Sequence, residues 1–304
     1  SAGVAWSKLE AEIKDLRQPV VDIQAEGKGP LNDMLGFFKN SPLNEWTHQA
    51  LAGARAQGNA DLRLGLSIPA VHAEQTQVRG NLQFNGNDVA FSPNAPLLSR
   101  VRGGLRFNAE GVEFSGIAAS VWGADVRLDG GAQAGAIQGQ PDVWIKAQGQ
   151  LNARDLQGAP ELSDWGSLLK TLDGSTFVSA QMQWRKGQLE TQISSDLVGM
   201  SIDAPQGLGK KASDALNVQF SNRLTPESLK NPQTLQDLVL LRVGPELEAR
   251  YQRNLNGAQP VVTRGLIRWG NATAPNLPER GVALRVTRDL LDLDPWLNWP
   301  VWSL

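Results

Sequence analysis

The chain of 304 residues contains no cysteine, which excludes disulfide bonds, thiolate metal sites, iron–sulfur clusters and thiol catalysis together. Its histidines are only His48 and His72, too few for an ordinary zinc or iron site. Positive charge is not in excess, because 29 Lys and Arg stand against 31 Asp and Glu, a formal net charge of −2. Since nucleic-acid binders neutralise phosphates with clustered Lys and Arg, this balance argues against nucleic acid as a partner.

Long hydrophobic runs are also missing. No stretch reaches the roughly 18 consecutive apolar residues of a membrane-spanning helix, and no basic-then-apolar signal precedes the first residues. The chain opens within a pattern and stops just after an apolar cluster. We therefore expect an internal segment of a longer protein, whose membrane anchor and address would lie elsewhere.

The dominant pattern is strict alternation of apolar and polar residues. Leu62, Leu64 and Leu66 alternate with Arg63 and Gly65, which is typical of a strand with one apolar and one polar face. Hydrophobic residues make up 41% of the chain, enough for a folded core. The same alternation recurs at residues 78–84, 89–91, 101–107, 112–114, 126–128, 143–145, 189–193, 216–220, 247–251, 265–269 and 282–286.

Turn-type sequences lie between these runs and predict antiparallel hairpins, at residues 85–88, 108–111, 129–131, 185–187 and 254–257. Helical patterns are few and short, at residues 31–39, 42–57, 162–172, 226–238 and 291–298. We interpret the chain as three parts: a β segment over 1–30, a short helical insertion over 31–58, and a repetitive antiparallel sheet over 59–304 that is truncated at its end.

So many one-sided strands contribute more apolar surface than the short helices can cover. Two closures satisfy this excess: the sheet packs on itself as a sandwich or barrel, or it curls into a trough around something apolar. Periodicity alone leaves both open.

Residues for chemistry are scarce. The run 207–211 has the Gly-Lys of a phosphate loop but lacks its earlier Gly and its following Ser or Thr. Glu45 and His48 supply two metal ligands where a site needs three, and Asp292 and Asp294 fit helix capping better than metal binding. No Gly-x-Ser-x-Gly elbow is present, while paired carboxylates for glycoside hydrolysis stay open. We predict no catalytic residue, no metal and no cofactor, hence no enzyme.

A succession of motifs carries more information than any single one. It begins with Gly80-Asn-Leu-Gln-Phe-Asn-Gly-Asn-Asp-Val-Ala-Phe91 and continues through Arg102-Gly-Gly-Leu-Arg-Phe107. Further motifs lie at residues 40–43, 62–69, 95–98, 111–114, 121–123, 195–205, 209–210, 280–284 and 291–296. Their order, over roughly residues 30–300, resembles the YhdP branch of the AsmA-like proteins of Gram-negative bacteria. The chain departs from that pattern by a small insertion at 205–210 and by a poor match over 225–260.

This resemblance implies a bridge-like lipid transfer protein. The implied fold is a long twisted antiparallel β-sheet, curled into an open apolar groove with a few short helices. The implied function is movement of phospholipids between the inner and outer membrane along this groove, in support of the outer-membrane barrier. The resemblance further implies a periplasmic segment of a parent protein anchored in the inner membrane.

We predict that one face of the sheet binds phospholipid acyl chains, with the core of a closed β-sandwich as the alternative for each residue. The predicted lipid-binding residues are Leu64, Leu66, Leu82, Phe84, Leu105, Phe107, Phe114, Val126, Leu128, Ile145, Ile193, Val218 and Phe220. The alternative function is that of a scaffold or assembly factor, which captures outer-membrane or periplasmic proteins through an exposed sheet edge.

Overall fold

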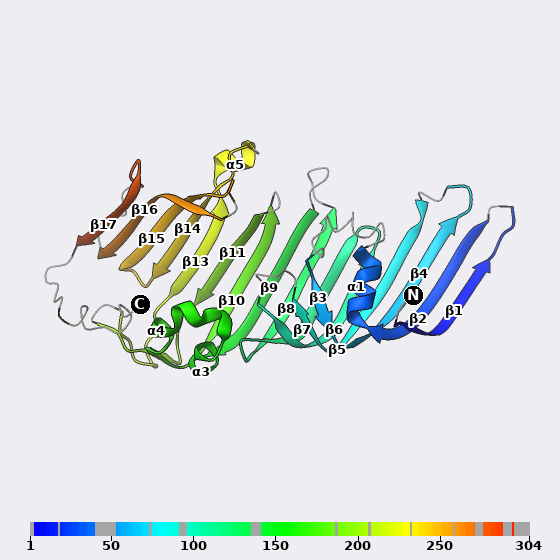
Figure 1. Ribbon diagram of the computed structural model, residues 1–304, viewed down its shortest axis with the longest axis horizontal. Helices are drawn as coiled ribbons and strands as arrows, with labels where there is room; N and C mark the ends of the chain where they lie inside the picture. Colours follow the sequence, from blue (N-terminus) through cyan, green and yellow to red (C-terminus); the bar gives the residue numbers. More distant parts are fainter. Residues whose placement is uncertain are drawn as a thin grey trace. The chain divides into compact units, whose positions relative to one another are not determined.

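Strands dominate the fold (Figure 1). A computed structural model of the chain describes residues 3–17, 19–39, 53–72, 75–90, 96–134, 141–185, 188–205, 208–231, 233–257, 259–270, 276–287 and 294. Within this part of the chain, seventeen strands belong to a single sheet, and the helices are short. The prediction of a mainly β, largely antiparallel sheet with few helices is confirmed. A sandwich would need two packed sheets, whereas the described strands belong to one.

The chain divides into two compact units, each of which is described by itself. Unit 1 comprises Ser1–Val121 with Asp125–Ile145, and unit 2 comprises Trp122–Ala124 with Lys146–Leu304. Strand β9 (Pro141–Asn152) contributes its beginning to unit 1 and its remainder to unit 2.

In unit 1, hydrogen-bonded pairing gives the lateral order β1–β2–β4–β5–β6–β7, and the short β3 pairs with the end of β5. Helix α1 (Leu31–Lys39) follows β2 directly and packs against β3, burying Leu31 and Met34. The strands are β1 (Ala5–Ile13), β2 (Val20–Pro30), β3 (Arg55–Gln57), β4 (Asn59–Pro69), β5 (Gln77–Ala90), β6 (Leu98–Asn108), β7 (Gly111–Val121) and β8 (Ala124–Ala134).

In unit 2, the pairing order is β10–β11–β13–β14–β15–β16–β17, and β12 pairs with the beginning of β10. Every pair is antiparallel except β16–β17, which is parallel and therefore needs a crossover connection. The strands are β10 (Leu172–Arg185), β11 (Gln188–Ser195), β12 (Met200–Ile202), β13 (Val218–Leu224), β14 (Gln236–Val243), β15 (Leu247–Asn254), β16 (Val261–Gly270) and β17 (Gly281–Thr287).

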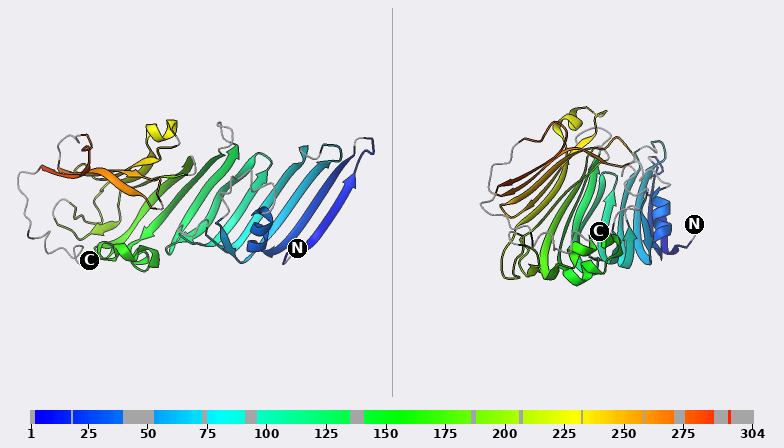
Figure 2. Two further views of the ribbon diagram at one scale, coloured as in Figure 1. Left: turned by 45° about the horizontal axis from the view of Figure 1, so that its top comes forward. Right: turned by 60° about the vertical axis from the view of Figure 1, so that its left-hand side comes forward.

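The helices of unit 2 lie at the ends of strands, where they connect one strand to the next (Figure 2). Helix α3 (Ala153–Gln157), the 3₁₀ helix η2 (Pro160–Trp165) and α4 (Gly166–Leu169) join β9 to β10, and α5 (Pro226–Lys230) joins β13 to β14. Thr225 caps α5, because its hydroxyl accepts a hydrogen bond from the N–H of Ser228, and proline opens the first turn.

These helices are shorter than their patterns suggest. The helical pattern at 162–172 corresponds to η2 and α4, and β10 already begins at Leu172. The pattern at 226–238 corresponds to α5 alone, since β14 begins at Gln236. Of the pattern at 42–57, residues 55–57 form β3 and residues 40–52 lie outside the described part, as do all of residues 291–298 except Asp294.

Two of the predicted turns are wrong. Residues 85–88 lie inside β5 and residues 129–131 inside β8. At the first position the strand bulges, because the buried Asn87 amide donates to the carbonyls of Gln57 and Asn59, and its oxygen accepts from the N–H of Asn85. Gly86 has φ +97°, a backbone conformation that side chains disfavour. At the second position, Gly130 and Gly131 allow neighbouring strands and rings to approach closely.

Candidate functional site

In unit 1, the register brings the predicted residues to one face of the sheet, called here the apolar face. Directly paired residues of adjacent strands point to the same side. Leu82 is paired with Leu105, and Leu105 with Phe114, so three strands contribute one apolar row. Leu64 is paired with Gly80 and Gly80 with Phe107, which forms the next row. Leu66 and Phe84 extend the same face by alternation.

The face continues on the next two strands of unit 1. The Ser115 hydroxyl donates to Asp129 Oδ1 at 2.7 Å, which places Asp129 opposite the apolar face and, by alternation, Val126 and Leu128 on it. Likewise, the indole Nε1 of Trp144 lies 3.6 Å from where a Cβ on Gly131 would be, on the side of Asp129. The neighbouring Ile145 therefore points to the apolar face.

In unit 2, the three predicted residues share a face in the same way. Ile193 is paired with Phe220, and Val218 with Ser195 in the next rung. The row through Ile193 and Phe220 extends across seven strands, namely β10, β11 and β13 to β17. Its members are Ala180, Ile193, Phe220, Leu241, Ala249, Ile267 and Leu284.

The prediction missed the residues of β14 to β17 on this face. The row adjacent to that of Ile193 and Phe220, on the same face, contains Val243, Leu247, Trp269 and Val286. None of these four was among the predicted lipid-binding residues. Their alternation is visible in the sequence, so pattern alone would have found them.

Burial along the apolar face is uneven. Leu82, Phe107, Val126 and Leu128 are buried, whereas the other predicted residues are only half-buried. At the outermost strands, large side chains of this face are open: Leu9 of β1 is 71% exposed and Leu284 of β17 is 67% exposed. Large exposed apolar side chains of this kind, where they gather into a patch, are characteristic of a binding surface.

The opposite face of unit 1 is charged. Glu26, Arg63, Asn81, Arg106 and Glu113 form one rung across five strands, and ion pairs join Arg63 to Glu26 and Arg106 to Glu113 at 3.8 Å each. All four charged side chains are largely exposed, so each pair contributes at most about 1 kcal/mol. Their main effect is to keep this face in water.

At the edge of the same face, Asp22 has two polar partners. The Ser67 hydroxyl donates to Asp22 Oδ1 at 2.8 Å, and the Lys14 ammonium lies 3.0 Å from Oδ2. The Ser67 hydrogen bond first, and then the Lys14 contact, hold the pKa of Asp22 below its ordinary value.

Unit 2 carries a buried ion pair in line with the apolar rows. Asp237 is 2% exposed and is paired in register with Leu224 and Arg253. Arg253 donates from Nε to Asp237 Oδ1 at 3.0 Å and from Nη2 to Oδ2 at 2.5 Å. This bidentate contact raises the pKa of Arg253 above its usual value. It ties β14 to β15 beside α5 and gives the apolar rows a polar boundary.

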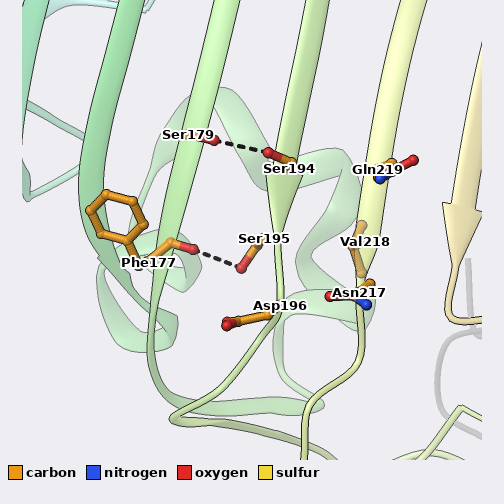
Figure 3. A pocket seen from close by; sticks show the side chains of 8 residues that line it. All are labelled: Phe177, Ser179, Ser194, Ser195, Asp196, Asn217, Val218 and Gln219. Atoms are coloured by element: carbon orange, nitrogen blue, oxygen red, sulfur yellow. Dashed lines mark hydrogen bonds between the residues drawn. The ribbon is translucent and has the colours of Figure 1, made fainter.

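Three hollows among the described residues lie mainly on the opposite face of their unit, and each is lined by both polar and apolar residues. One of 290 Å³ in unit 2 is lined by Phe177, Ser179, Ser194 and Gln219 among others (Figure 3). Its hydroxyls are already engaged, because those of Ser179 and Ser194 share a hydrogen bond of 2.8 Å. A second, of 660 Å³ in unit 1, has charged residues including Glu10, Lys14 and Arg79 in its lining, and the third is amphipathic.

The phosphate-loop likeness around Lys210 has a structural explanation. Its ammonium donates to the carbonyls of Leu197 and Met200, and so fixes the turn between β11 and β12, where Leu197 has φ +52°. Burial lowers the pKa of Lys210, and Asp214 and Asp196 oppose that shift. The Lys210 ammonium thus has a structural role in this turn.

Among the described side chains, no group of three His, Asp or Glu is close enough to hold a metal ion. His72 is exposed, whereas Glu45, His48 and Asp292 lie outside the described residues. No described helix is long and apolar enough to cross a membrane. The described strands instead provide rows of apolar side chains that extend from one strand to the next.

These features define a class of protein, a β-sheet protein in which each unit presents rows of apolar side chains on one face of its sheet. A family model described as "YhdP protein" matches residues 1–302, and the chain belongs to the YhdP family, as its motifs predicted. It is 23% identical over 292 residues to the "Intermembrane phospholipid transporter YhdP" of Escherichia coli (strain K12). This match covers 93% of the chain and 22% of the relative, so the chain spans about a fifth of that protein's length. No solved structure is matched.

Proposed function

We propose that this chain is a segment of a protein that transfers phospholipids between two membranes, with acyl chains lying on the apolar face. The observation that carries the proposal is the unbroken apolar row from Ala180 to Leu284 in unit 2, with its counterparts in unit 1. The relative's name, an intermembrane phospholipid transporter, supports the same activity.

The physical basis is transfer of hydrocarbon out of water. Each methylene placed on an apolar surface is stabilised by about 0.8 kcal/mol when fully buried, so an acyl chain gains from every rung that it crosses. Successive rungs present similar side chains, and the described hollows lie mainly on the opposite face. A lipid can therefore move from rung to rung without leaving a deep pocket. The charged headgroup would stay in water at the ends of the strands.

The proposal extends to cellular context. The YhdP relationship supports a place in the Gram-negative envelope, with this segment in the periplasm and the parent protein anchored in the inner membrane. Phospholipid delivery to the outer membrane would then support its barrier. Inner membrane, outer membrane and phospholipid are the partners that this function requires.

Photo-crosslinking in living cells tests the proposal. A photoreactive residue replaces Leu64, Leu105 or Val218 on the apolar face of the full-length protein, and phospholipid adducts are detected with radiolabelled phosphate. Matched controls occupy the opposite face of the same strands, at Arg63, Arg106 and Gln219.

We expect phospholipid adducts at the first set and none at the controls. Equal labelling of both faces would mean adventitious contact with membranes and would contradict the proposal. Protein adducts alone, at either face, would instead favour the scaffold function in which a client strand pairs with the sheet edge.

A further inference from the structure

Four aromatic rings of the apolar face lie over glycines of the adjacent strand. Trp6 is paired with Gly27, Phe107 with Gly80 and Tyr251 with Gly265, and Phe114 lies against Gly130. A Cβ added to each glycine would approach a ring carbon to 2.9 Å at Gly27, 2.1 Å at Gly80, 2.5 Å at Gly265 and 2.4 Å at Gly130. Since real Cβ atoms do not come this close, each ring occupies the space that a side chain would take.

The pair of Gly80 and Phe107 shows the arrangement most simply. All three heavy atoms nearest to a Cβ at Gly80 belong to the Phe107 ring, and no backbone atom is among them. Phe107 is only 4% exposed, although Leu105 and Leu64 beside it are half-buried. The ring therefore lies down on the neighbouring strand instead of standing out from the sheet.

We infer that these glycines set the depth of the lipid path, by giving large rings a place to lie flat below the passing acyl chain. The inference rests on the proposed function. Side chains on a strand ordinarily stand roughly perpendicular to the sheet, and an upright ring would project into the space that an acyl chain must cross. A ring that lies flat thus packs against the sheet without adding an obstacle.

Two glycines of the opposite face, Gly104 and Gly65, provide a contrast. At Gly104, an added Cβ would meet only the tips of Gln83 and Asn81, at 3.3 Å and 3.5 Å. At Gly65, it would meet the flexible side chain of Arg79. Neither glycine lies under an aromatic ring, so replacing them changes local packing without changing the apolar face.

The test combines Gly80→Ala with lipid capture in the full-length protein. A photoreactive residue at Leu64 or Leu105 reports phospholipid adducts per folded molecule, while thermal unfolding reports stability separately. We expect Gly80→Ala to lower the adduct yield by roughly fivefold, because overpacking of a close contact forces the ring off its place. Gly104→Ala, on the opposite face, is the matched control and should leave the yield unchanged.

A double variant shows whether Gly80→Ala lowers lipid capture by displacing the Phe107 ring or only by disturbing packing. In a Phe107→Ala background, where no ring remains to be displaced, Gly80→Ala should cause little further loss of adduct. If Gly80→Ala lowers stability while the adduct yield per folded molecule stays at the wild-type level, the glycine serves packing alone and the inference is overturned. An equal loss in both backgrounds overturns it as well.

A second pair of glycine and aromatic ring keeps the inference testable if Gly80→Ala prevents folding. Trp6 lies in β1 and Gly27 in the neighbouring β2, where Trp6 is 43% exposed and the contact is milder. Gly27→Ala with a photoreactive residue at Leu9 should again reduce phospholipid capture, and a wild-type yield there contradicts the inference. Absence of adducts in the protein without any glycine change would refute the proposed function itself, which is a different result.

Discussion

Each of the two units has an apolar face, but the units differ on the opposite face. In unit 1, the central rung of that face contains only charged and amide side chains, from Glu26 to Glu113. In unit 2, a comparable rung is Ser221, Leu240, Arg250, Leu266 and Ala283, and Leu266 is 1% exposed. Unit 2 thus has buried apolar residues on both sides of its sheet.

The crossover between β16 and β17 explains part of this difference. A parallel pair needs a connection that passes over one face of the sheet. Leu277 of that connection lines a hollow of 610 Å³ together with Leu238 and Leu240, so the connection covers the opposite face. Unit 1 lacks such a cover in its described residues and must draw its cohesion from the apolar face and α1. The same alternating strand pattern is therefore stabilised by packing on one face in unit 1 and on both faces in unit 2.

The buried ion pair of unit 2 should give the largest effect on stability. Asp237→Asn leaves the half-buried Arg253 without its charged partner, and breaking this pair should cost up to about 5 kcal/mol, the upper end for a buried pair. The exposed pair of unit 1 provides the control, since Glu113→Gln should cost no more than about 1 kcal/mol. Urea unfolding of each variant measures the difference. Similar losses for the two variants would remove this contrast between the units.

The apolar layer on the opposite face of unit 2 should give the next largest effect on stability. Leu266→Ala in unit 2 should cost about 2–5 kcal/mol, the range for emptying a buried leucine site. Arg63→Ala, on the opposite face of unit 1, should change stability by about 0.5 kcal/mol or less, because its side chain is exposed. Chemical denaturation distinguishes the two. A small loss at Leu266 would show that unit 2, too, is held from one side.

The smallest effect is expected in acid, at the edge of unit 1. Folding lowers the pKa of Asp22, so its carboxylate stabilises the fold above its unfolded pKa, and that contribution is lost as the pH falls through the lowered folded value. Asp22→Asn should therefore flatten the acid side of a plot of unfolding temperature against pH. An unchanged acid slope in the variant would show that Lys14 and Ser67 do not favour the charged form.

Alternation in the sequence was sufficient to assign side chains to faces. In unit 1 the register puts Leu64 and Leu105 on one face, and in unit 2 it puts Val218 on the face of Ile193 and Phe220, because a period of two fixes which side of the sheet each strand residue occupies. Whether lipid binds there stays a prediction.

Glycine and asparagine were the main source of error in the fold. Asn87 and Gly130 are typical turn residues, yet both lie within strands, where one holds a bulge and the other accepts a ring. Local sequence cannot distinguish these uses, since each depends on a partner strand distant in the chain. The role of Lys210 was hidden for the same reason, because its partners are backbone carbonyls of an adjacent turn.

The parallel pairing of β17 also changes the end of the sheet at which the chain leaves this strand. In an antiparallel meander, consecutive connections emerge alternately at the two ends of the strands. Because β17 runs in the same direction as β16, the chain leaves β17 at the same end at which it left β16. One crossover thus exchanges the ends at which all later connections would appear. Any helix or loop inserted after Thr287 would border the opposite rim from the one that an unbroken meander would assign to it.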